Sequence, residues 1–279
     1  MDYITRAKKF RAKKRLGQNF LVDENIIMSV LEHSEVGSKD VVVEIGPGLG
    51  FVTEQLVKCA KKVYAVELDS DVIEILKKIP CNNLEILNQD ILKTDISKFG
   101  DNLKIIANIP YYITSPILAH LLGEIDDLNN KNRKSINEIY LMVQYEVAQR
   151  LVAKEDSPSK QYGLLSILAQ FNADVEILEF VPSKCFFPRP KVDSAIVKIK
   201  INDKPAVKTD DYSFLKKVTK ACFATRRKNL KNSLCNFGFD KVAVEKTLKN
   251  LGLNENIRGE NLSIEQMKNL SEELKKCLQ

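Results

Sequence analysis

Residues 41–50, Val-Val-Val-Glu-Ile-Gly-Pro-Gly-Leu-Gly, constrain the fold of this chain more than any other segment. A run of β-branched apolar residues is typical of a strand buried on both faces of a parallel sheet. The glycines that follow allow the backbone to approach a ligand closely, and a helical pattern begins directly after them. The segment therefore predicts a strand, a tight turn and a helix, with a ligand site at the turn.

Helical and buried-strand patterns alternate from residue 24 to about residue 120. We expect strands at residues 40–45, 62–67, 84–88 and 103–107, and helices at 24–34, 51–61, 70–78 and 116–122. This alternation predicts an α/β, doubly wound core. Two further strands, at 173–181 and 194–201, are expected to form a hairpin that closes the sheet with an antiparallel edge.

Residues 202–211 show no apolar periodicity and are the expected linker. Beyond them, helical patterns cover residues 213–236, 242–251 and 263–278. We therefore expect two domains, one of residues 1–201 and a small all-helical one of residues 202–279.

The composition excludes several classes of protein. With 279 residues, 44% of them hydrophobic, the chain can form one large core and a second small domain. No apolar run approaches the roughly 18 residues of a membrane span, and the basic N-terminus lacks the apolar core of a secretory signal. Six scattered cysteines without a C-x-x-C pair and two histidines do not form a zinc pattern. We expect a cytoplasmic protein with reduced thiols and no metal.

The net charge of +6 lies in the first fifteen residues, which contain seven Lys or Arg and one acid, Asp2. Basic and acidic residues balance in the rest of the chain. A basic arm on a neutral body suggests salt-sensitive contacts with nucleic-acid phosphates. The alternative is a disordered tail that increases solubility.

The glycine spacing at residues 46–50 is G-x-G-x-G, and Glu44 precedes it. A nicotinamide-binding fingerprint would read G-x-G-x-x-G and would place a pyrophosphate at the helix N-terminus. A carboxylate at position 44 would repel a pyrophosphate, but it suits the sulfonium and ammonium of S-adenosylmethionine. The pattern favours a methyl donor over a dinucleotide, the alternative for an oxidoreductase.

Two carboxylates follow successive predicted strands. Glu67 ends the second strand, where it could bind both hydroxyls of a ribose, and Asp90 lies just past the third, where it could accept a hydrogen bond from an adenine amine. Either residue alone could be a solvated charge at a strand end. Their succession after a glycine turn favours the cofactor role.

The fourth predicted strand ends in Asn108-Ile109-Pro110-Tyr111. An amide oxygen of Asn108 and a nearby main-chain carbonyl could accept the two N–H bonds of an adenine N6 amine. Pro110 would stiffen the turn, and the ring of Tyr111 could stack on an extruded base. The tetrapeptide could also be an ordinary turn, since Asn and Pro are common there. Its place beside the cofactor residues favours methylation of a base, by positioning and electrostatics without a general base.

Six segments resemble, in order, the KsgA/RsmA family of rRNA adenine N6,N6-dimethyltransferases, and the resemblance covers essentially the whole chain. They are residues 17–21, 44–50, 67–69, 88–90, 108–111 and 186–192. The resemblance implies a Rossmann-like class I methyltransferase sheet and S-adenosylmethionine as methyl donor. It also implies dimethylation of two adjacent adenosines in the 3′-terminal hairpin loop of 16S rRNA in the 30S subunit, and a role in ribosome biogenesis.

The family's motifs assign site residues by position. Cofactor contacts fall on Asn19, Leu21, Gly46, Glu67, Asp90 and Asn108, and target-base contacts on Asn108, Pro110, Tyr111 and Phe186. Phe186 would stack on the base opposite Tyr111. Because neighbouring side chains of an extended segment point in opposite directions, one of Phe186 and Phe187 is expected in the core.

The Erm-type enzymes, which dimethylate 23S rRNA, share the cofactor turn and are the nearest alternative. Residues 223–234 resemble the KsgA-type pattern F-x-x-R-R-K-x-x-x-N-S-L, which favours 16S rRNA and the small ribosomal subunit as partners of a monomeric enzyme. Arg226, Arg227, Lys228 and Lys231 are expected on one helix, either facing rRNA phosphates or as a merely solvated face. A mainly non-catalytic role in small-subunit assembly is the other alternative.

Overall fold

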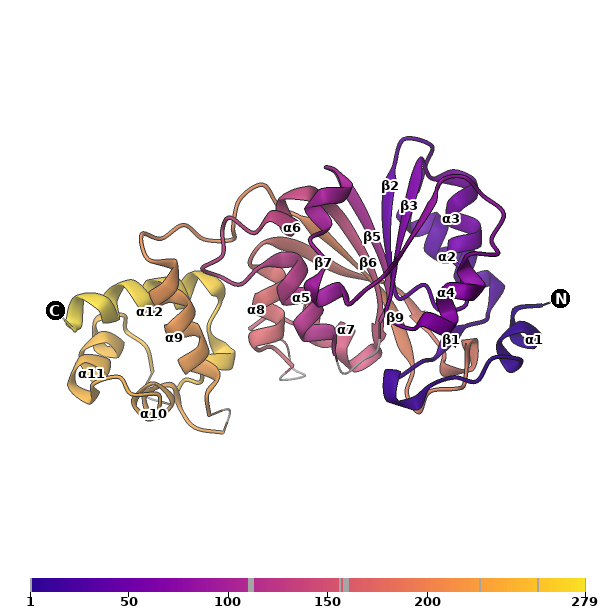
Figure 1. Cartoon of the computed structure of the whole chain (residues 1–279). Helices are drawn as coiled ribbons and strands as arrows, with labels where there is room; N and C mark the ends of the chain where they lie inside the picture. Colours follow the sequence, from indigo (N-terminus) through magenta and orange to yellow (C-terminus); the bar gives the residue numbers. More distant parts are fainter. Residues whose placement is uncertain are drawn as a thin grey trace. The chain divides into compact units, whose positions relative to one another are not determined.

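The computed structural model describes residues 2–109, 113–155, 157, 161–225, 227–254 and 256–278. Its main feature is a seven-stranded sheet of order β4-β3-β2-β5-β6-β9-β7 (Figure 1). The strands are β2 (Val41–Ile45), β3 (Lys62–Glu67), β4 (Leu84–Asn88), β5 (Leu103–Asn108), β6 (Ile136–Gln144), β7 (Ala173–Val181) and β9 (Ser194–Ile201). Strands β2 to β6 are parallel and β9 is antiparallel to β6, so the predicted α/β sheet and its closing hairpin are confirmed.

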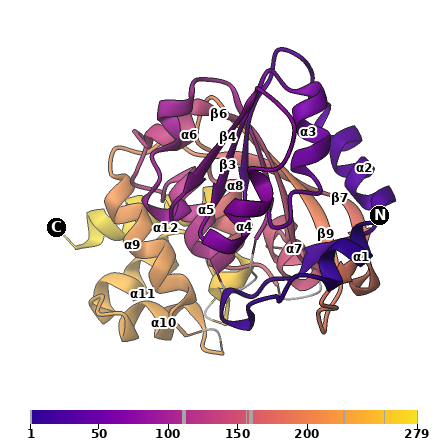
Figure 2. The same ribbon diagram turned by 45° about the vertical axis from the view of Figure 1, so that its right-hand side comes forward.

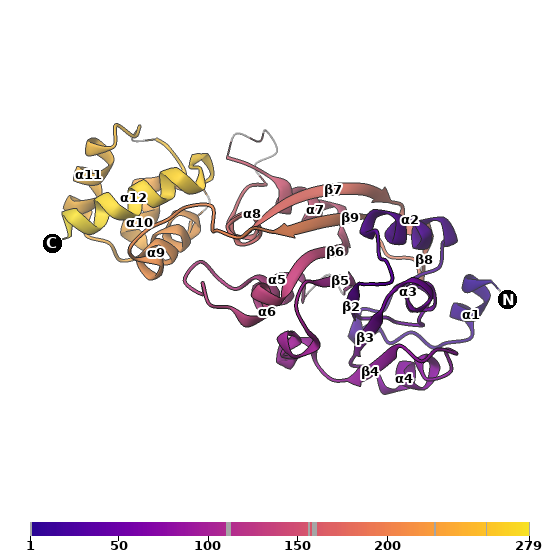
Figure 3. The same cartoon turned by 90° about the horizontal axis from the view of Figure 1, so that it is seen from above.

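The chain divides into two compact units, each described by itself. The first comprises Met1–Leu121, Asn129–Ala148 and Asp174–Ile201, and the second Leu122–Leu128, Gln149–Ala173 and Asn202–Gln279. Helices α2 (Glu24–Ser34), α3 (Thr53–Cys59) and α4 (Ser70–Leu76) lie on one side of the sheet, and α5 (Thr114–Leu122) lies on the other (Figures 1 and 3). Two short helices, α6 (Lys131–Ser135) and α7 (Tyr145–Val152), flank β6 in the sequence. Because strands β2 to β6 are parallel, their carboxyl ends lie at one edge of the sheet, and the loops that follow β2, β3 and β5 meet there.

A second, two-stranded sheet joins segments that are far apart in the sequence. Strand β1 (Phe20–Leu21) pairs with β8 (Phe186–Phe187), and the register places Phe20 opposite Phe187 and Leu21 opposite Phe186. The amide of Val22 extends the pairing by donating to the carbonyl of Cys185 at 2.8 Å. Two-residue strands leave no alternation in the sequence, so periodicity could not predict this pairing.

The second unit contains α8 (Leu164–Gln170), α9 (Tyr212–Phe223), α10 (Leu230–Asn236), α11 (Lys241–Asn250) and α12 (Ile264–Cys277). Apolar side chains from these helices, and Phe171 directly after α8, form one buried cluster that includes Leu215, Leu234, Leu248 and Leu270. No helix within the described residues is long and apolar enough to cross a membrane.

The prediction of a single helix over residues 213–236 is wrong, because the chain turns between α9 and α10. The side chain of Asn229 accepts a hydrogen bond from the amide of Asn232 at 3.0 Å and so starts a new helix. Exposed Arg227 and Lys228 lie in this turn, while Arg226 lies outside the described residues. Of the four predicted cations, the described helix α10 contains only Lys231.

Candidate functional site

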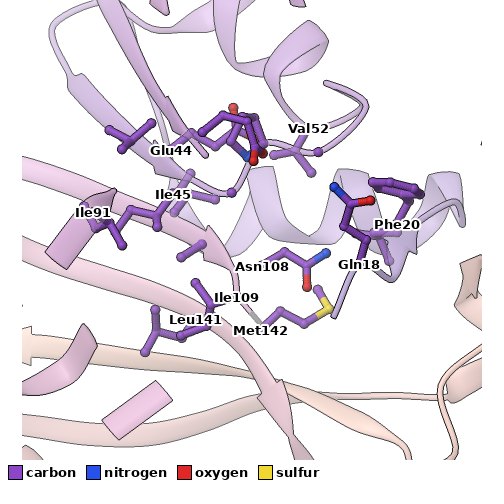
Figure 4. Close-up of a pocket in the computed structure, with 18 of the residues that line it drawn as sticks. Gln18, Phe20, Glu44, Ile45, Val52, Ile91, Asn108, Ile109, Leu141 and Met142 are labelled. Atoms are coloured by element: carbon purple, nitrogen blue, oxygen red, sulfur yellow. The ribbon is translucent and has the colours of Figure 1, made fainter. Parts of the chain in front are cut away.

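A pocket lies at the carboxyl edge of the sheet, within the first unit (Figure 4). The turn after β2, the ends of β3 and β5, the residues after β4 and the N-terminal arm all contribute to its lining; the arm is taken from here on as residues 1–21, the basic stretch together with β1. The six residues predicted to contact a cofactor all line it: Asn19, Leu21, Gly46, Glu67, Asp90 and Asn108. Residues spread over ninety positions of sequence thus meet in one place, as the strand order requires.

Two glycines of the turn after β2 have left-handed backbone conformations. Gly46 has φ 68°, and a Cβ atom there would lie 3.2 Å from the carbonyl oxygen of Asn108. Gly48 has φ 54°, and its Cβ would lie 2.9 Å from the ring of Phe20. Glycine is needed at both positions, because the turn is in close contact with β5 and with the arm.

Glu44, at the end of β2, is buried with only 3% of its surface exposed. Burial is the main cause that raises the pKa of its carboxyl to about 8, and the neighbouring Glu67 raises it further. The hydroxyl of Thr53 donates to Glu44 at 2.6 Å and partly opposes this shift. A cation bound in the pocket would favour the ionised carboxylate, so this wall of the pocket suits a positively charged ligand.

Glu67 and Asp90, the two carboxylates predicted to bind the nucleoside part of a ligand, both line the pocket. The amides of Leu68 and Asp69 each donate to the same oxygen of Glu67 at 2.8 Å, which fixes that carboxylate, while burial still raises its pKa. The carboxylate of Asp90 accepts from the amide of Leu92 at 3.0 Å and caps the short turn after β4. Both acceptors are therefore held in place before any ligand binds.

Asn108, the last residue of β5, points into the pocket (Figure 4). Its side-chain nitrogen donates to the main-chain carbonyl of Asn19 at 3.3 Å. Within the described residues, no donor bonds to its amide oxygen. The arm thus sets the orientation of the amide and leaves an acceptor for a ligand amine.

The basic N-terminal arm is folded against the rest of the first unit (Figure 2), and only its last residues, 16–21, line the pocket. It contains α1 (Tyr3–Lys8), where Arg6 pairs with Glu54 and lies 4.7 Å from the ring centre of Phe51. Further along, Lys13 forms an ion pair with Asp69, and its distance to Asp71 is 2.7 Å. Two of the seven arm cations therefore attach the arm to the body.

Gln18 makes a second bond to the same carboxylate, because its side-chain nitrogen donates to Asp69 at 2.7 Å. Burial opposes ionisation of Asp69, but the bonds from Lys13 and Gln18 outweigh it, and its pKa is lowered. Lys13, Gln18 and Asp69 are called the arm clamp below. The sequence did not reveal the clamp, since no pattern connects residues more than fifty positions apart.

The other arm cations face solvent. Five are exposed: Lys8, Lys9, Arg11, Lys14 and Arg15. Among the described residues, no carboxylate lies within salt-bridge distance of any of them. These five charges remain available to a polyanion.

The residues predicted to hold a target base do not all line the pocket, in contrast to those predicted to contact the cofactor. Phe186 is 3% exposed and belongs to the same apolar cluster as Phe20, Leu21 and Met142, directly behind the pocket wall. Phe187 is half-buried at the edge of that cluster. Pro110 and Tyr111 lie outside the described residues. In the parts of the chain that are described, no group of three or more His, Cys, Asp or Glu could hold a metal ion.

Comparison with known proteins agrees with this arrangement. A family model described as ribosomal RNA adenine dimethylase matches residues 9–276. The chain is 41% identical to ribosomal RNA small subunit methyltransferase A of Bacillus mycoides (strain KBAB4) over 278 residues, which covers 95% of this chain and 92% of the relative.

Two solved structures are similar over nearly the whole chain. A dimethyladenosine transferase from Plasmodium falciparum has a TM-score of 0.75 and 27% identity, covering 91% of this chain and 97% of that one. The 23S rRNA methyltransferase ErmE has a TM-score of 0.65 and 26% identity, covering 92% of this chain and 100% of that one.

Proposed function

The chain belongs to the ribosomal RNA adenine dimethylase family, and we propose that it dimethylates two adjacent adenosines in the 3′-terminal hairpin loop of 16S rRNA in the 30S subunit. S-adenosylmethionine is the proposed donor, N6,N6-dimethyladenosine the product, and the cytoplasm the site of action. The main support is the pocket in which Asn19, Glu67, Asp90 and Asn108 converge around a buried acid, Glu44. The 41% identical relative, named for the small subunit, supports 16S over 23S rRNA.

The residues of the pocket fit the proposed donor. Glu67 would accept hydrogen bonds from the ribose hydroxyls, and Asp90 would accept one from the adenine amine. Glu44 would offset the positive charge of the sulfonium and ammonium groups. Leu21 and the backbone of Gly46 would enclose the methionine end. When bound, S-adenosylmethionine supplies an electrophilic methyl group.

Asn108 would hold the target amine. Its free amide oxygen and a main-chain carbonyl near Ile109 would accept the two N6 hydrogens, so that the nitrogen lone pair points at the methyl group. In a direct displacement, N6 would form the bond to the methyl carbon as the carbon–sulfur bond of the donor breaks, and the cationic N6 would then lose its proton to solvent. Orientation and electrostatics supply the rate enhancement, and the chain needs no general base.

A flipped adenine needs two apolar faces. We assign them to Tyr111 and Phe186, with Pro110 stiffening the connection to Asn108. Since Phe186 is 3% exposed in the free protein, its ring has to become accessible when RNA binds. It lies on β8, whose partner β1 belongs to the arm, so binding of RNA to the arm could be coupled to exposure of this ring.

The proposed phosphate contacts come from the exposed arm cations and, in the second unit, from Arg227 and Lys228 in the turn between α9 and α10. Lys231 pairs with Glu245 at 2.5 Å and is expected to contribute less.

Labelled methyl transfer tests the assignment. The enzyme is incubated with labelled S-adenosylmethionine and either unmethylated 30S particles or unmethylated 23S rRNA, and the modified bases are mapped. We expect label on two adjacent adenosines of 16S rRNA only. Label confined to 23S rRNA would establish the Erm-type alternative. Binding to 30S particles without any transfer would instead indicate an assembly role.

A further inference from the structure

We propose that Tyr145 and Phe180 form an exposed aromatic platform on which a nucleotide next to the target adenosine stacks, with Arg189 and Lys191 binding its phosphates. This inference depends on the proposed function, since it assigns a further contact with the same RNA. It concerns a surface outside the cofactor pocket.

The platform consists of two aromatic rings that contact each other and remain partly exposed in the free protein. Tyr145 starts α7 and Phe180 lies near the end of β7, and their ring centroids are 5.2 Å apart with an interplanar angle of 87°. Tyr145 is 37% exposed and Phe180 is 48% exposed. Each ring fixes the other in an edge-to-face contact while leaving area for a third ring. Exposed aromatics held in this way suit single-stranded nucleic acid, because every base has a face that can stack.

Hydrogen bonds through Asp193 and Ser183 connect one cation, Arg189, to this pair. The main-chain amide of Tyr145 donates to the carbonyl of Asp193 at 3.0 Å, and the side chain of Asp193 accepts from the amide of Ser183 at 2.8 Å. The hydroxyl of Ser183 in turn accepts from Nε of Arg189 at 3.1 Å. These three bonds link the guanidinium of Arg189, through Ser183 and Asp193, to the main chain of Tyr145.

The segment between β7 and β9 is strongly basic on its exposed side. Lys184, Arg189 and Lys191 are exposed, and within the described residues no carboxylate lies at salt-bridge distance from them. The acids nearest in sequence are Glu179, which bonds to Ser29 and His33, and the half-buried Asp193, which accepts the bond from Ser183. The exposed side of this segment is therefore positive, complementary to an RNA backbone, while the acid beside Tyr145 is Glu146 on α7.

The strand register places the platform next to the proposed site of methylation. Asn108 of β5 pairs with Met142 of β6, and Tyr145 follows three residues further in the same direction. Three residues of extended chain span about 10 Å, a distance within reach of a neighbouring nucleotide. The platform thus lies on the edge where the target base would leave the RNA chain.

Leucine variants separate stacking from simple burial. Tyr145→Leu and Phe180→Leu keep apolar bulk but remove the ring, whereas Tyr145→Phe keeps the ring. We expect each leucine variant to raise both KM and Kd for unmethylated 30S particles about tenfold. The kcat, the Kd for S-adenosylmethionine and the melting temperature should stay near those of the wild type, as should all values for Tyr145→Phe. Met28→Ala, at a side chain of α2 that is 43% exposed, is the matched control.

The outcomes distinguish this inference from the proposed function. If the wild type is active and both leucine variants keep its KM and Kd, the platform is refuted and the proposed function stands. Equal losses in Tyr145→Phe and Tyr145→Leu would also overturn it, because the ring would then not be the cause. A wild type that binds 30S particles without methylating them would overturn the proposed function, and the Kd values would still decide whether the rings contact RNA.

Discussion

The side-chain nitrogen of Asn108 donates a hydrogen bond to the main-chain carbonyl of Asn19 across 3.3 Å. This bond joins the end of β5 to the arm and fixes which atom of the amide faces the pocket. The oxygen that would accept the target amine is therefore in place before RNA binds, as preorganised catalysis requires.

Replacing Asn108 with alanine should lower kcat by about 100- to 1000-fold, the usual effect of removing one preorganised polar contact to a reacting group. Single-turnover methyl transfer to 30S particles measures it. The melting temperature and circular dichroism should remain near the wild type, because Asn108 is only partly buried and bonds to a single carbonyl. Turnover like that of the wild type would refute the role given to this side chain.

The arm clamp should control cofactor affinity. Lys13→Met leaves buried Asp69 with Gln18 as its only side-chain donor among the described residues, so the arm should leave the pocket more easily. We expect the Kd for S-adenosylmethionine, measured by calorimetry, to rise about tenfold, which corresponds to about 1.4 kcal/mol. The matched control is Lys9→Met, which removes an exposed arm charge and should leave the Kd unchanged. Equal effects of the two substitutions would argue against the clamp.

The order of helices and strands could be predicted from the sequence because each element has its own spacing of apolar residues. The bounds expected for α2, β3, β4, β7 and β9 agree with the structure. The helix expected over residues 213–236 is broken at Asn229, since apolar spacing continues through the turn and only the capping bond marks the new start.

Contacts between distant segments could not be predicted from single-sequence patterns. Glu67 and Asp90 were found because parallel strands deliver their ends to one edge, a rule of topology. The bond from Gln18 to Asp69 and the pairing of Phe20 with Phe187 follow only from the folded chain. The proposed roles of Asn108 and Phe186 remain predictions from the sequence motifs.

The buried acid predicts an unusual dependence of stability on pH. The pKa of Glu44 is about 8 in the folded protein, above its ordinary value of 4.5. The folded state keeps this proton up to a higher pH than the unfolded state does. The contribution of Glu44 to the free energy of unfolding is therefore fully present below pH 4.5 and is lost as the pH rises to about 8. We expect a loss on the order of 5 kcal/mol over this range in the free protein, from about 1.36 kcal/mol per pH unit. Denaturant unfolding of Glu44→Gln at each pH should lack this component, and identical pH profiles would contradict the assignment.

The same titration should affect ligand binding in the opposite direction. A sulfonium favours ionised Glu44, so the affinity for S-adenosylmethionine should increase up to about pH 8 and its binding should release protons. Calorimetry in buffers of different ionisation enthalpy detects that release. S-adenosylhomocysteine, which lacks the sulfonium charge, should show a shallower dependence, and Glu44→Gln should show none from this group.

The exposed arm cations should determine part of the salt dependence of RNA binding. Replacing Lys8 and Lys9 with glutamine should lower the slope of log Kd against log salt by roughly 0.7 to 0.9 for each phosphate that the arm no longer neutralises. Binding to 30S particles at several salt concentrations measures this slope. The control Lys77→Gln/Lys78→Gln removes the same charge from the end of α4, where both residues are exposed. A slope that changes equally in both variants would indicate a general charge effect instead of binding of RNA by the arm.

Phe186 and Phe187 can be distinguished by leucine substitutions that keep apolar volume and remove the ring. Because Phe186 is 3% exposed inside an apolar cluster, Phe186→Ala would cost about 3–5 kcal/mol and could not separate folding from function. Phe186→Leu fills most of the space, so we expect a small change in melting temperature but about a tenfold lower kcat/KM for 30S particles. Phe187→Leu should retain activity near that of the wild type. A loss confined to Phe187→Leu would transfer the stacking role to that ring, whose half-buried position needs no rearrangement of β8 before a base can reach it.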